Sequence, residues 1–411
     1  MPNVSGESPL NPSRPAVLPR TFGRYELRAV TSANRWGVIF EAADPEAGGE
    51  PRAVGVLDPL LMNVPGLAPL FVSTAQHATG RVHPSLVRVY EAGFERNLAY
   101  VVSEWLQGWD LHGVLRRCRS SGRPLPARHA LTLGTWAAEA LAALHAPEPD
   151  LPNGAIHGRL AADKLFVRED GRFKLIGIGL PEVGQELWPL PDDVDHYALL
   201  APEQLGDGVA DHRADVYTLC VLVTTMCTGQ NPFQRASIAK TAAAITSGDM
   251  KPCTTDRRMA PDLEMLLRRG MFVDPSQRPS SVAEIAEGLR PILASLGGPV
   301  EPEEWATFLK ALFHSDGHRP EGIREIEIQE RASRVMTAMD RWSPASMPQF
   351  DASRIMTPSA PSPLPPDEAT EETPAAATRT PVSIEGPAPH LPAPPPKAAA
   401  PSRRAPVLVG L

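Results

Sequence analysis

The sequence predicts an α+β fold in which short strands come first and helices follow. Three apolar runs between residues 25 and 57 suit strands, and turn residues separate them. Residues 127–145 instead carry apolar side chains at helical spacing. Residues 343–411 are rich in proline and alanine, a composition that does not build a packed core. We therefore expect a strand-rich part, a helical part and a disordered tail.

The first three strands of the strand-rich part are predicted to form a meander. Strands are expected at residues 25–30, 36–42, 51–57, 86–92 and 98–103. A separate hairpin is expected later in the chain, where β-rich runs at 156–167 and 173–179 flank an Asp-Gly turn.

Composition and charge exclude several classes of protein. The net charge is −8 and the pI is about 5.8, without a basic block that would bind nucleic acid or an anionic membrane. No apolar run approaches the roughly 18–20 residues that span a bilayer. The four cysteines lie far apart and form no C-x-x-C pair. This pattern favours free thiols in a reducing compartment over a zinc site or a disulfide. We expect a cytoplasmic protein without nucleic-acid or membrane partners.

Several separated motifs occur in a fixed order. They are H-G-R-L-A-A-D-K-L at residues 157–165, A-P-E at 201–203, D-V-Y-T at 215–218 and D-P-S-Q-R-P at 274–279. In this order and spacing they resemble motifs of the protein-kinase family, most closely the eukaryotic-like Ser/Thr kinases of bacteria, over about residues 22–295.

The resemblance implies a bilobed protein-kinase-like fold of the α+β class. The expected parts are a disordered arm at residues 1–22, a kinase-like domain at 23–295 with a small antiparallel β lobe at about 23–104 and a mainly helical large lobe at about 105–295, a helical extension at 296–342, and a disordered Pro/Ala-rich tail at 343–411.

The catalytic positions of the family hold residues that do not suit the chemistry. In kinases a lysine and a glutamate position the nucleotide, a loop aspartate accepts the substrate proton, and an asparagine and an aspartate hold magnesium. By register these five places hold Gly55, Thr74, Arg159, Lys164 and Gly177. No other lysine precedes Lys164 in the chain. The resemblance therefore implies a degenerate member, a pseudokinase, with no catalytic set and no magnesium site.

The nucleotide-binding positions are also degraded. The glycine-rich loop of the family keeps only its third glycine, because Ser32 and Asn34 stand at the first two places. A Cβ at both places obstructs the close approach of backbone to phosphate. Weak candidates for nucleotide contact remain at Gly37, Ile39, Ala53 and Glu104. We expect no bound cofactor, with ATP binding weak or absent.

Residues that hold the family fold together are kept. They are His157, Glu203, Asp215 and Arg278. In the family the glutamate and the arginine form a buried ion pair, and breaking such a pair costs about 3–5 kcal/mol. Phosphorylation control is absent instead: residues 180–200 contain no serine or threonine, and Gly158 replaces the arginine that would bind a phosphate.

Arg159 and Lys164 place two positive charges where magnesium would sit, and like charges this close together need a compensating anion. Asp163 or the cluster of Asp192, Asp193 and Asp195 supplies it internally, or a bound anion does. The sequence leaves both readings open.

Three functions remain for a domain of this kind. The favoured one is a catalytically inactive scaffold or regulator in bacterial signalling, which binds a kinase or signalling complex through the large lobe, residues 303–342 or the tail. The alternatives are an active Ser/Thr kinase with non-standard residues and a metal-independent nucleotide or anion sensor. An apolar stripe at Trp305, Phe308, Leu309, Leu312 and Phe313 predicts one helix, and residues 322–342 predict another. These helices either dock back on the large lobe or present the stripe to a partner.

Overall fold

A computed structural model describes residues 18–34, 36–149, 151–152, 154–178, 193–206, 210–251, 260–313 and 325–341. The expectations for the arm at 1–17 and for the tail at 343–411 lie outside these ranges. Within the described ranges, no helix is long and apolar enough to cross a membrane.

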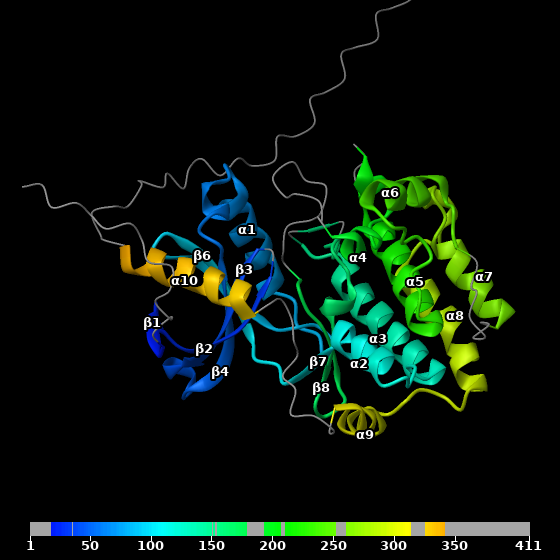
Figure 1. Cartoon of the computed structure of the whole chain (residues 1–411), viewed down its shortest axis with the longest axis horizontal. Helices are drawn as coiled ribbons and strands as arrows, with labels where there is room; N and C mark the ends of the chain where they lie inside the picture. The colour runs from blue at the N-terminus through cyan, green and yellow to red at the C-terminus, as the bar shows by residue number, and fades with distance from the viewer. Residues whose placement is uncertain are drawn as a thin grey trace, which may run out of the picture. The chain divides into compact units, whose positions relative to one another are not determined.

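The first lobe is built on a six-stranded antiparallel sheet (Figure 1). Its strand order is β1-β2-β3-β4-β6-β5. The strands are β1 (Arg20–Phe22), β2 (Tyr25–Asn34), β3 (Gly37–Asp44), β4 (Glu50–Leu57), β5 (Val89–Glu95) and β6 (Leu98–Glu104). We expected the disordered arm to reach residue 22, but β1 pairs with β2 because the Phe22 side chain is fully buried in the core there.

Each face of this sheet packs against one helix, because successive side chains of a strand point to opposite faces. On one face, Val38 and Phe40 of β3 and Val54 and Val56 of β4 join a core with helix α10 (Glu325–Arg341). On the other face, Ile39 and Val101 pack with helix α1 (Leu67–Thr79). The sheet of the small lobe is thus covered on both sides.

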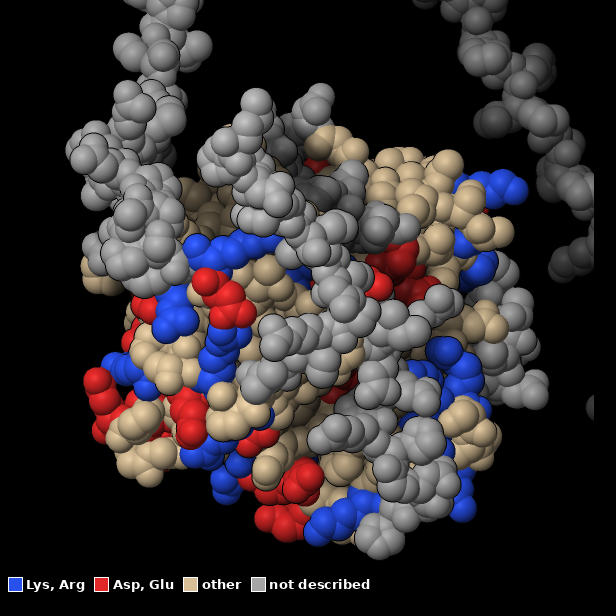
Figure 2. Space-filling view, turned by 60° about the vertical axis from the view of Figure 1, so that its left-hand side comes forward, with Lys and Arg blue, Asp and Glu red and all other residues tan. Residues whose placement is uncertain are grey.

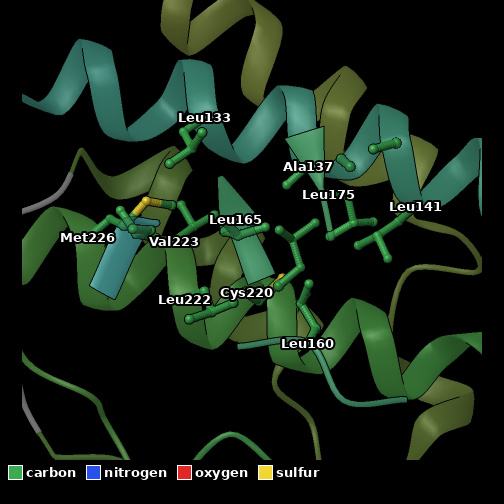
Figure 3. Close-up of a cluster of buried hydrophobic side chains, with 14 of the residues drawn as sticks. Leu133, Ala137, Leu141, Leu160, Leu165, Leu175, Cys220, Leu222, Val223 and Met226 are labelled. Atoms are coloured by element: carbon green, nitrogen blue, oxygen red, sulfur yellow. The ribbon is translucent and has the colours of Figure 1, made fainter. Parts of the chain in front are cut away.

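The second lobe is mainly helical, as the fold prediction expects. Its helices are α2 (Leu111–Ser120), α3 (Ala127–His145), α4 (Val194–Tyr197), α5 (His212–Thr228), α6 (Ile238–Ser247), α7 (Pro261–Gly270) and α8 (Val282–Ser295). Figure 3 shows the core, where side chains of α3 and α5 meet Leu160 and the hairpin residues Leu165 and Leu175. Helix α3 has the bounds that the sequence predicts, and its apolar side chains meet α5 and α8.

A small sheet carries the loop that the sequence analysis singles out. It consists of β7 (Gly108–Asp110), β8 (Leu165–Arg168) and β9 (Phe173–Leu175), in that order. A single 3-10 turn, Ala162–Lys164, precedes β8. Because Leu165 and Leu175 are fully buried, the hairpin is fixed to the core of the large lobe.

The helical extension packs on the rest of the domain. Helix α9 (Pro302–Phe313) contacts α2, its Trp305 side chain is fully buried, and its Phe313 ring stacks on Trp109 at 4.7 Å. Helix α10 does not lie on the large lobe, as docking of both helices there would require, but on β2 and β3 of the small lobe (Figure 1). The face of that sheet with Val38, Phe40, Val54 and Val56 is apolar, and the apolar side chains of α10 pack against it.

Candidate functional site

A buried carboxylate on α5 holds the loop that corresponds to the catalytic loop. Asp215 accepts hydrogen bonds from the backbone N–H groups of His157 and Gly158 at 2.7 and 2.9 Å, and its Oδ2 lies 2.9 Å from Nε2 of His145. Burial acts to raise the pKa of Asp215, but His145 and these hydrogen bonds outweigh it, so the pKa is lowered. The ionised carboxylate therefore fixes the loop backbone.

His157 links this loop to the end of strand β9. Its ring is buried, and Nε2 lies 3.0 Å from the carbonyl oxygen of Ile176. Burial lowers the pKa of His157 and keeps the imidazole neutral. Its role here is structural.

Lys164 and Gly177 occupy one shared space. The Lys164 side chain passes so close to Gly177 that a Cβ at position 177 would lie 2.8 Å from Cδ of the lysine. Gly177 has a φ of +83°, a conformation that suits glycine. The lysine side chain thus fills the room that a larger residue at 177 would need. Among Arg159, Lys164 and Gly177, the residues at the proton-acceptor and two metal-ligand positions, none offers a carboxylate to a metal ion.

The charge of Lys164 is compensated inside the protein. Its Nζ lies 2.5 Å from Oδ2 of Asp163, and the other carboxylate oxygen of Asp163 lies 3.6 Å from Nε2 of His196 on α4. Nδ1 of His196 lies 2.8 Å from Asp193. The two carboxylates favour the protonated imidazole and raise the pKa of His196 to about 9. Although burial opposes it, the charge of Lys164 keeps the pKa of Asp163 below its usual range. Asp163 therefore supplies an internal anion for Lys164.

A second glycine lies at the place of the nucleotide-binding lysine, on β4 of the small lobe. The Trp36 indole lies over Gly55, and a Cβ at position 55 would come within 2.6 Å of Cη2 of the ring. The indole is 7% exposed and its centroid lies 5.6 Å from that of Phe71 on α1. The tryptophan therefore fills the space that a lysine side chain at 55 would enter.

Thr74 stands on α1, where the partner glutamate belongs. Its hydroxyl donates to the carbonyl of Leu70, one turn earlier in the same helix, at 2.6 Å. This contact is ordinary for threonine in a helix. The residue forms a bond within its own helix in place of the missing ion pair.

The retained glycine, Gly37, serves the packing of two strands. A Cβ at this position would lie 2.0 Å from the carbonyl oxygen of Val56 on β4. The loop before it is tied by Asn34, whose Oδ1 accepts from the N–H groups of Trp36 and Gly37, both at 3.1 Å. The close approach of β3 to β4 requires glycine at this position, whether or not a phosphate binds nearby.

The remaining nucleotide candidates lie on three strands. Ile39 on β3 is half-buried and packs against the cluster that contains Trp36. Ala53 on β4 is half-buried and pairs with Ser103 on β6. Glu104 ends β6, and its Oε1 accepts from Lys174 Nζ at 2.6 Å and from the Arg88 N–H at 2.7 Å. The Glu104 side chain thus joins the two lobes through β9.

Glu203 and Arg278 form a bidentate ion pair in the large lobe. The two guanidinium nitrogens donate to the two carboxylate oxygens at 2.7 and 2.8 Å, and the arginine side chain is fully buried. The guanidinium also lies 5.0 Å from the ring centroid of Tyr217. This pair fixes the segment after α4 to the turn before α8.

Sequence reasoning missed the residues that fill the vacated places. Trp36 was not singled out, and Lys164 was treated as a replaced asparagine and as a cation that needs an anion. Neither side chain was expected to lie on a glycine. A signal existed in the sequence: register predicts glycine at two catalytic positions, and glycine leaves room for a neighbouring side chain. The pairing of Lys174 with Glu104 had no such signal.

Comparisons with known proteins point to one family. A family model described as protein tyrosine and serine/threonine kinase matches residues 68–289. The tyrosine-protein kinase MasK of Myxococcus xanthus is 27% identical over 287 residues, which are 67% of this chain and 44% of that protein. The serine/threonine-protein kinase PknE of Mycobacterium tuberculosis is 24% identical over 276 residues, 67% of this chain and 47% of PknE. The chain thus spans under half the length of these two relatives.

Solved structures share the fold. The crystal structure of the M. tuberculosis PknI kinase domain covers 67% of this chain and 98% of its own, with a TM-score of 0.54 and 21% identity. A second crystal structure of the same domain gives a TM-score of 0.53 and 20% identity. The two-lobed architecture, the ordered motifs and the family match lead to one conclusion: the chain belongs to the protein tyrosine and serine/threonine kinase family, with bacterial kinases as its relatives.

Proposed function

We propose that this protein is a catalytically inactive kinase-like domain that works by binding other proteins. The observation that carries the proposal is the pair of filled spaces: Trp36 lies over Gly55 where the nucleotide-binding lysine belongs, and Lys164 lies over Gly177 where a metal-binding aspartate belongs. The residues that would position the nucleotide and magnesium are replaced, and neighbouring side chains take up their room.

The chemistry of phosphoryl transfer supports the proposal. Catalysis there consists of positioning and of electrostatic stabilisation by a lysine, carboxylates and magnesium. Such groups act as a unit, so the loss of several leaves little activity. Here the lysine, its glutamate partner, the proton acceptor and both metal ligands are replaced.

The contacts that hold the fold are kept beside these losses. Asp215 holds the loop backbone, and Glu203 pairs with the buried Arg278. A domain that retains its architecture without its chemistry suits a binding role in a signalling complex. The stripes of α9 and α10 are buried inside the domain, which leaves the surface of the large lobe and residues 343–411 as the partner-binding candidates. Met265, at 69% exposure on α7, is an apolar side chain on that surface.

The anion-sensor alternative is less well supported. Lys164, which would attract an anion, already pairs with Asp163 at 2.5 Å. A bound phosphate would have to displace this carboxylate.

A labelling experiment tests the absence of catalysis. The full chain is incubated with γ-labelled ATP and Mg²⁺ or Mn²⁺, with general kinase substrates and alone, beside an Arg159→Ala variant. We expect no incorporation above the level of the variant. Incorporation that disappears in Arg159→Ala would establish an active kinase with rearranged chemistry.

A second experiment tests the binding role. The tagged chain, with and without residues 343–411, is used for affinity purification under native conditions. We expect specific co-purified proteins, and their loss from the shortened form would assign the binding to the tail. If neither form retained a partner at stoichiometric amounts, the scaffold proposal would fail.

A further inference from the structure

Helix α10 covers one face of the small-lobe sheet with an apolar stripe. Ala332, Val335, Met336 and Met339 follow the spacing i, i+3, i+4, i+7, and each is no more than 4% exposed. They join the apolar core of the sheet, and helix α10 itself lies on strands β2 and β3 (Figure 1). Arg20 and Asp340 form an ion pair beside this stripe. Figure 2 shows that acidic and basic side chains are interspersed over the described surface on this side of the molecule.

Two arginines of α10 reach past the stripe to the tip of the β2–β3 hairpin and to the end of β4. Arg331 donates to the carbonyl oxygen of Asn34 at 2.6 Å. Arg334 donates to Oδ2 of Asp58 at 2.7 Å, and the Asp58 side chain is 4% exposed. The helix thus contacts two points far from it in sequence.

The same two points hold the backbone of Trp36. The Trp36 N–H donates to Oδ1 of Asn34 at 3.1 Å, and the Trp36 carbonyl accepts from the Asp58 N–H at 2.9 Å. Asn34 and Asp58 therefore each contact Trp36 on one side and an arginine of α10 on the other. This arrangement connects α10, on one face of the sheet, with the indole on the opposite face.

From this connection we propose that α10 is a latch that holds the Trp36 indole over Gly55. When α10 is docked, Asn34 and Asp58 are fixed and the tryptophan stays in the space of the missing lysine. When α10 leaves the sheet, both anchors lose a charged partner, and the hairpin tip gains the freedom to carry the indole outward. A ligand or partner that displaces α10 would then open the small lobe, which is a shift between two states. This regulation goes beyond the scaffold role and does not depend on whether the domain transfers phosphate.

The latch depends on contacts with the rest of the domain. Among the described side chains, the buried stripe, the two arginine contacts and the Arg20–Asp340 ion pair hold the helix, and most of the stability of a protein helix comes from such packing. Undocked, it would expose the apolar sheet residues Val38, Phe40, Val54 and Val56. A helix that is held by side-chain contacts on one face of a sheet is one that a competing helix or a modification can displace.

Fluorine NMR on the full chain tests the proposal. The protein is labelled with 5-fluorotryptophan, and Trp36→Phe assigns the resonance of Trp36. The test variant is Arg331→Ala/Arg334→Ala, and a second variant, Met336→Asp, weakens the apolar contact instead. Arg341→Ala, an exposed substitution on the same helix, is the matched control. Hydrogen exchange of residues 328–341 reports docking of α10 in every sample.

The proposal predicts one pattern in these samples. Both test variants speed hydrogen exchange in α10 and move the Trp36 resonance, with at least a twofold greater response to a soluble paramagnetic quencher, and Arg341→Ala matches the parent protein. An unchanged Trp36 resonance beside faster exchange in α10 would overturn the coupling. Unchanged exchange in both variants would show that these contacts do not hold the helix, which also overturns the proposal. These measurements depend neither on kinase activity nor on a partner protein. The latch and the scaffold role can therefore fail separately.

Discussion

The indole of Trp36 lies over Gly55 at a distance that leaves no room for a Cβ, since an added Cβ would meet Cη2 of the ring at 2.6 Å. By the register of the sequence, position 55 is where we expect the nucleotide-binding lysine of the family, so the indole lies where that side chain would extend. Lys164 and Gly177 repeat the relationship in the large lobe. In both lobes a glycine stands at a place where register predicts a catalytic residue, and the side chain of another residue covers it.

The first prediction concerns the strain that a side chain at position 55 would cause. Gly55→Ala should lower the free energy of unfolding by roughly 1–3 kcal/mol, because the methyl group overpacks against the rigid indole. Trp36→Ala alone should cost about 3–5 kcal/mol through the cavity that it leaves. In the double variant the alanine at 55 should add little, so the effects are non-additive. Urea denaturation measures all three proteins.

Gly93→Ala is the matched control, since its Cβ would meet only ordinary contacts at 3.5 Å on β5. Its unfolding free energy should stay close to that of the parent. Additive effects of Gly55→Ala and Trp36→Ala would contradict the contact.

The second prediction separates backbone strain from crowding at Gly177. Gly122 has a similar positive φ of +64° with no atom within 4 Å of an added Cβ, so Gly122→Ala reports the conformational cost alone, about 1–2 kcal/mol. Gly177→Ala should cost more than this, because the methyl group also meets Lys164. The excess should disappear when Lys164→Ala is added. Equal costs at 122 and 177 in thermal unfolding would refute the shared space.

The third prediction compares two ion pairs of the large lobe. Glu203→Ala should destabilise the protein by about 3–5 kcal/mol, because it leaves the fully buried Arg278 without its carboxylate. Glu264→Ala removes an exposed partner of Arg268 and should cost no more than about 0.5 kcal/mol. Chemical denaturation of both variants measures the difference. Similar small costs would mean that the buried pair does not hold the segment after α4.

The fourth prediction concerns the pH dependence of His196. Its pKa is raised to about 9 by Asp163 and Asp193, above the ordinary value of about 6.5. Since the folded value is the higher one, the protonated imidazolium stabilises the fold below about pH 6.5, and this contribution is lost as the pH rises through about 9. An NMR titration, with His196→Gln for assignment, should give a pKa near 9. Asp163→Asn should lower it, and a pKa that does not respond to this change would disprove the contact.

The fold was largely accessible from the sequence because it rests on local patterns. Helix α3 has its predicted bounds, and the hairpin of β8 and β9 lies where the Asp-Gly turn places it. The ordered motifs identified the two-lobed architecture, because motif spacing survives when individual residues change. Strand β5 begins at Val89 and not at residue 86, a shift of the size that pattern reasoning leaves at element ends.

For the candidate site, the sequence predicted which catalytic residues of the family are replaced, but not which side chains take up their space. Register predicts which residues stand at the five catalytic places, since register depends on spacing alone. It did not show that Trp36 covers Gly55 or that α10 contacts Asn34, because these contacts join elements that tertiary packing brings together. The prediction that α10 docks on the large lobe was wrong for the same reason. An amphipathic stripe predicts a buried face, but it does not say which lobe buries that face.

Calorimetric titration of the full chain with ATP in the presence of Mg²⁺, repeated with a chelator, tests the central claim most directly. Because Trp36 and Lys164 fill the places of the nucleotide lysine and a metal aspartate, we predict no heat of binding that depends on Mg²⁺ at millimolar ATP, while an active bacterial serine/threonine kinase measured alongside binds. Saturable binding that requires Mg²⁺ and is lost in the chelator would contradict the account.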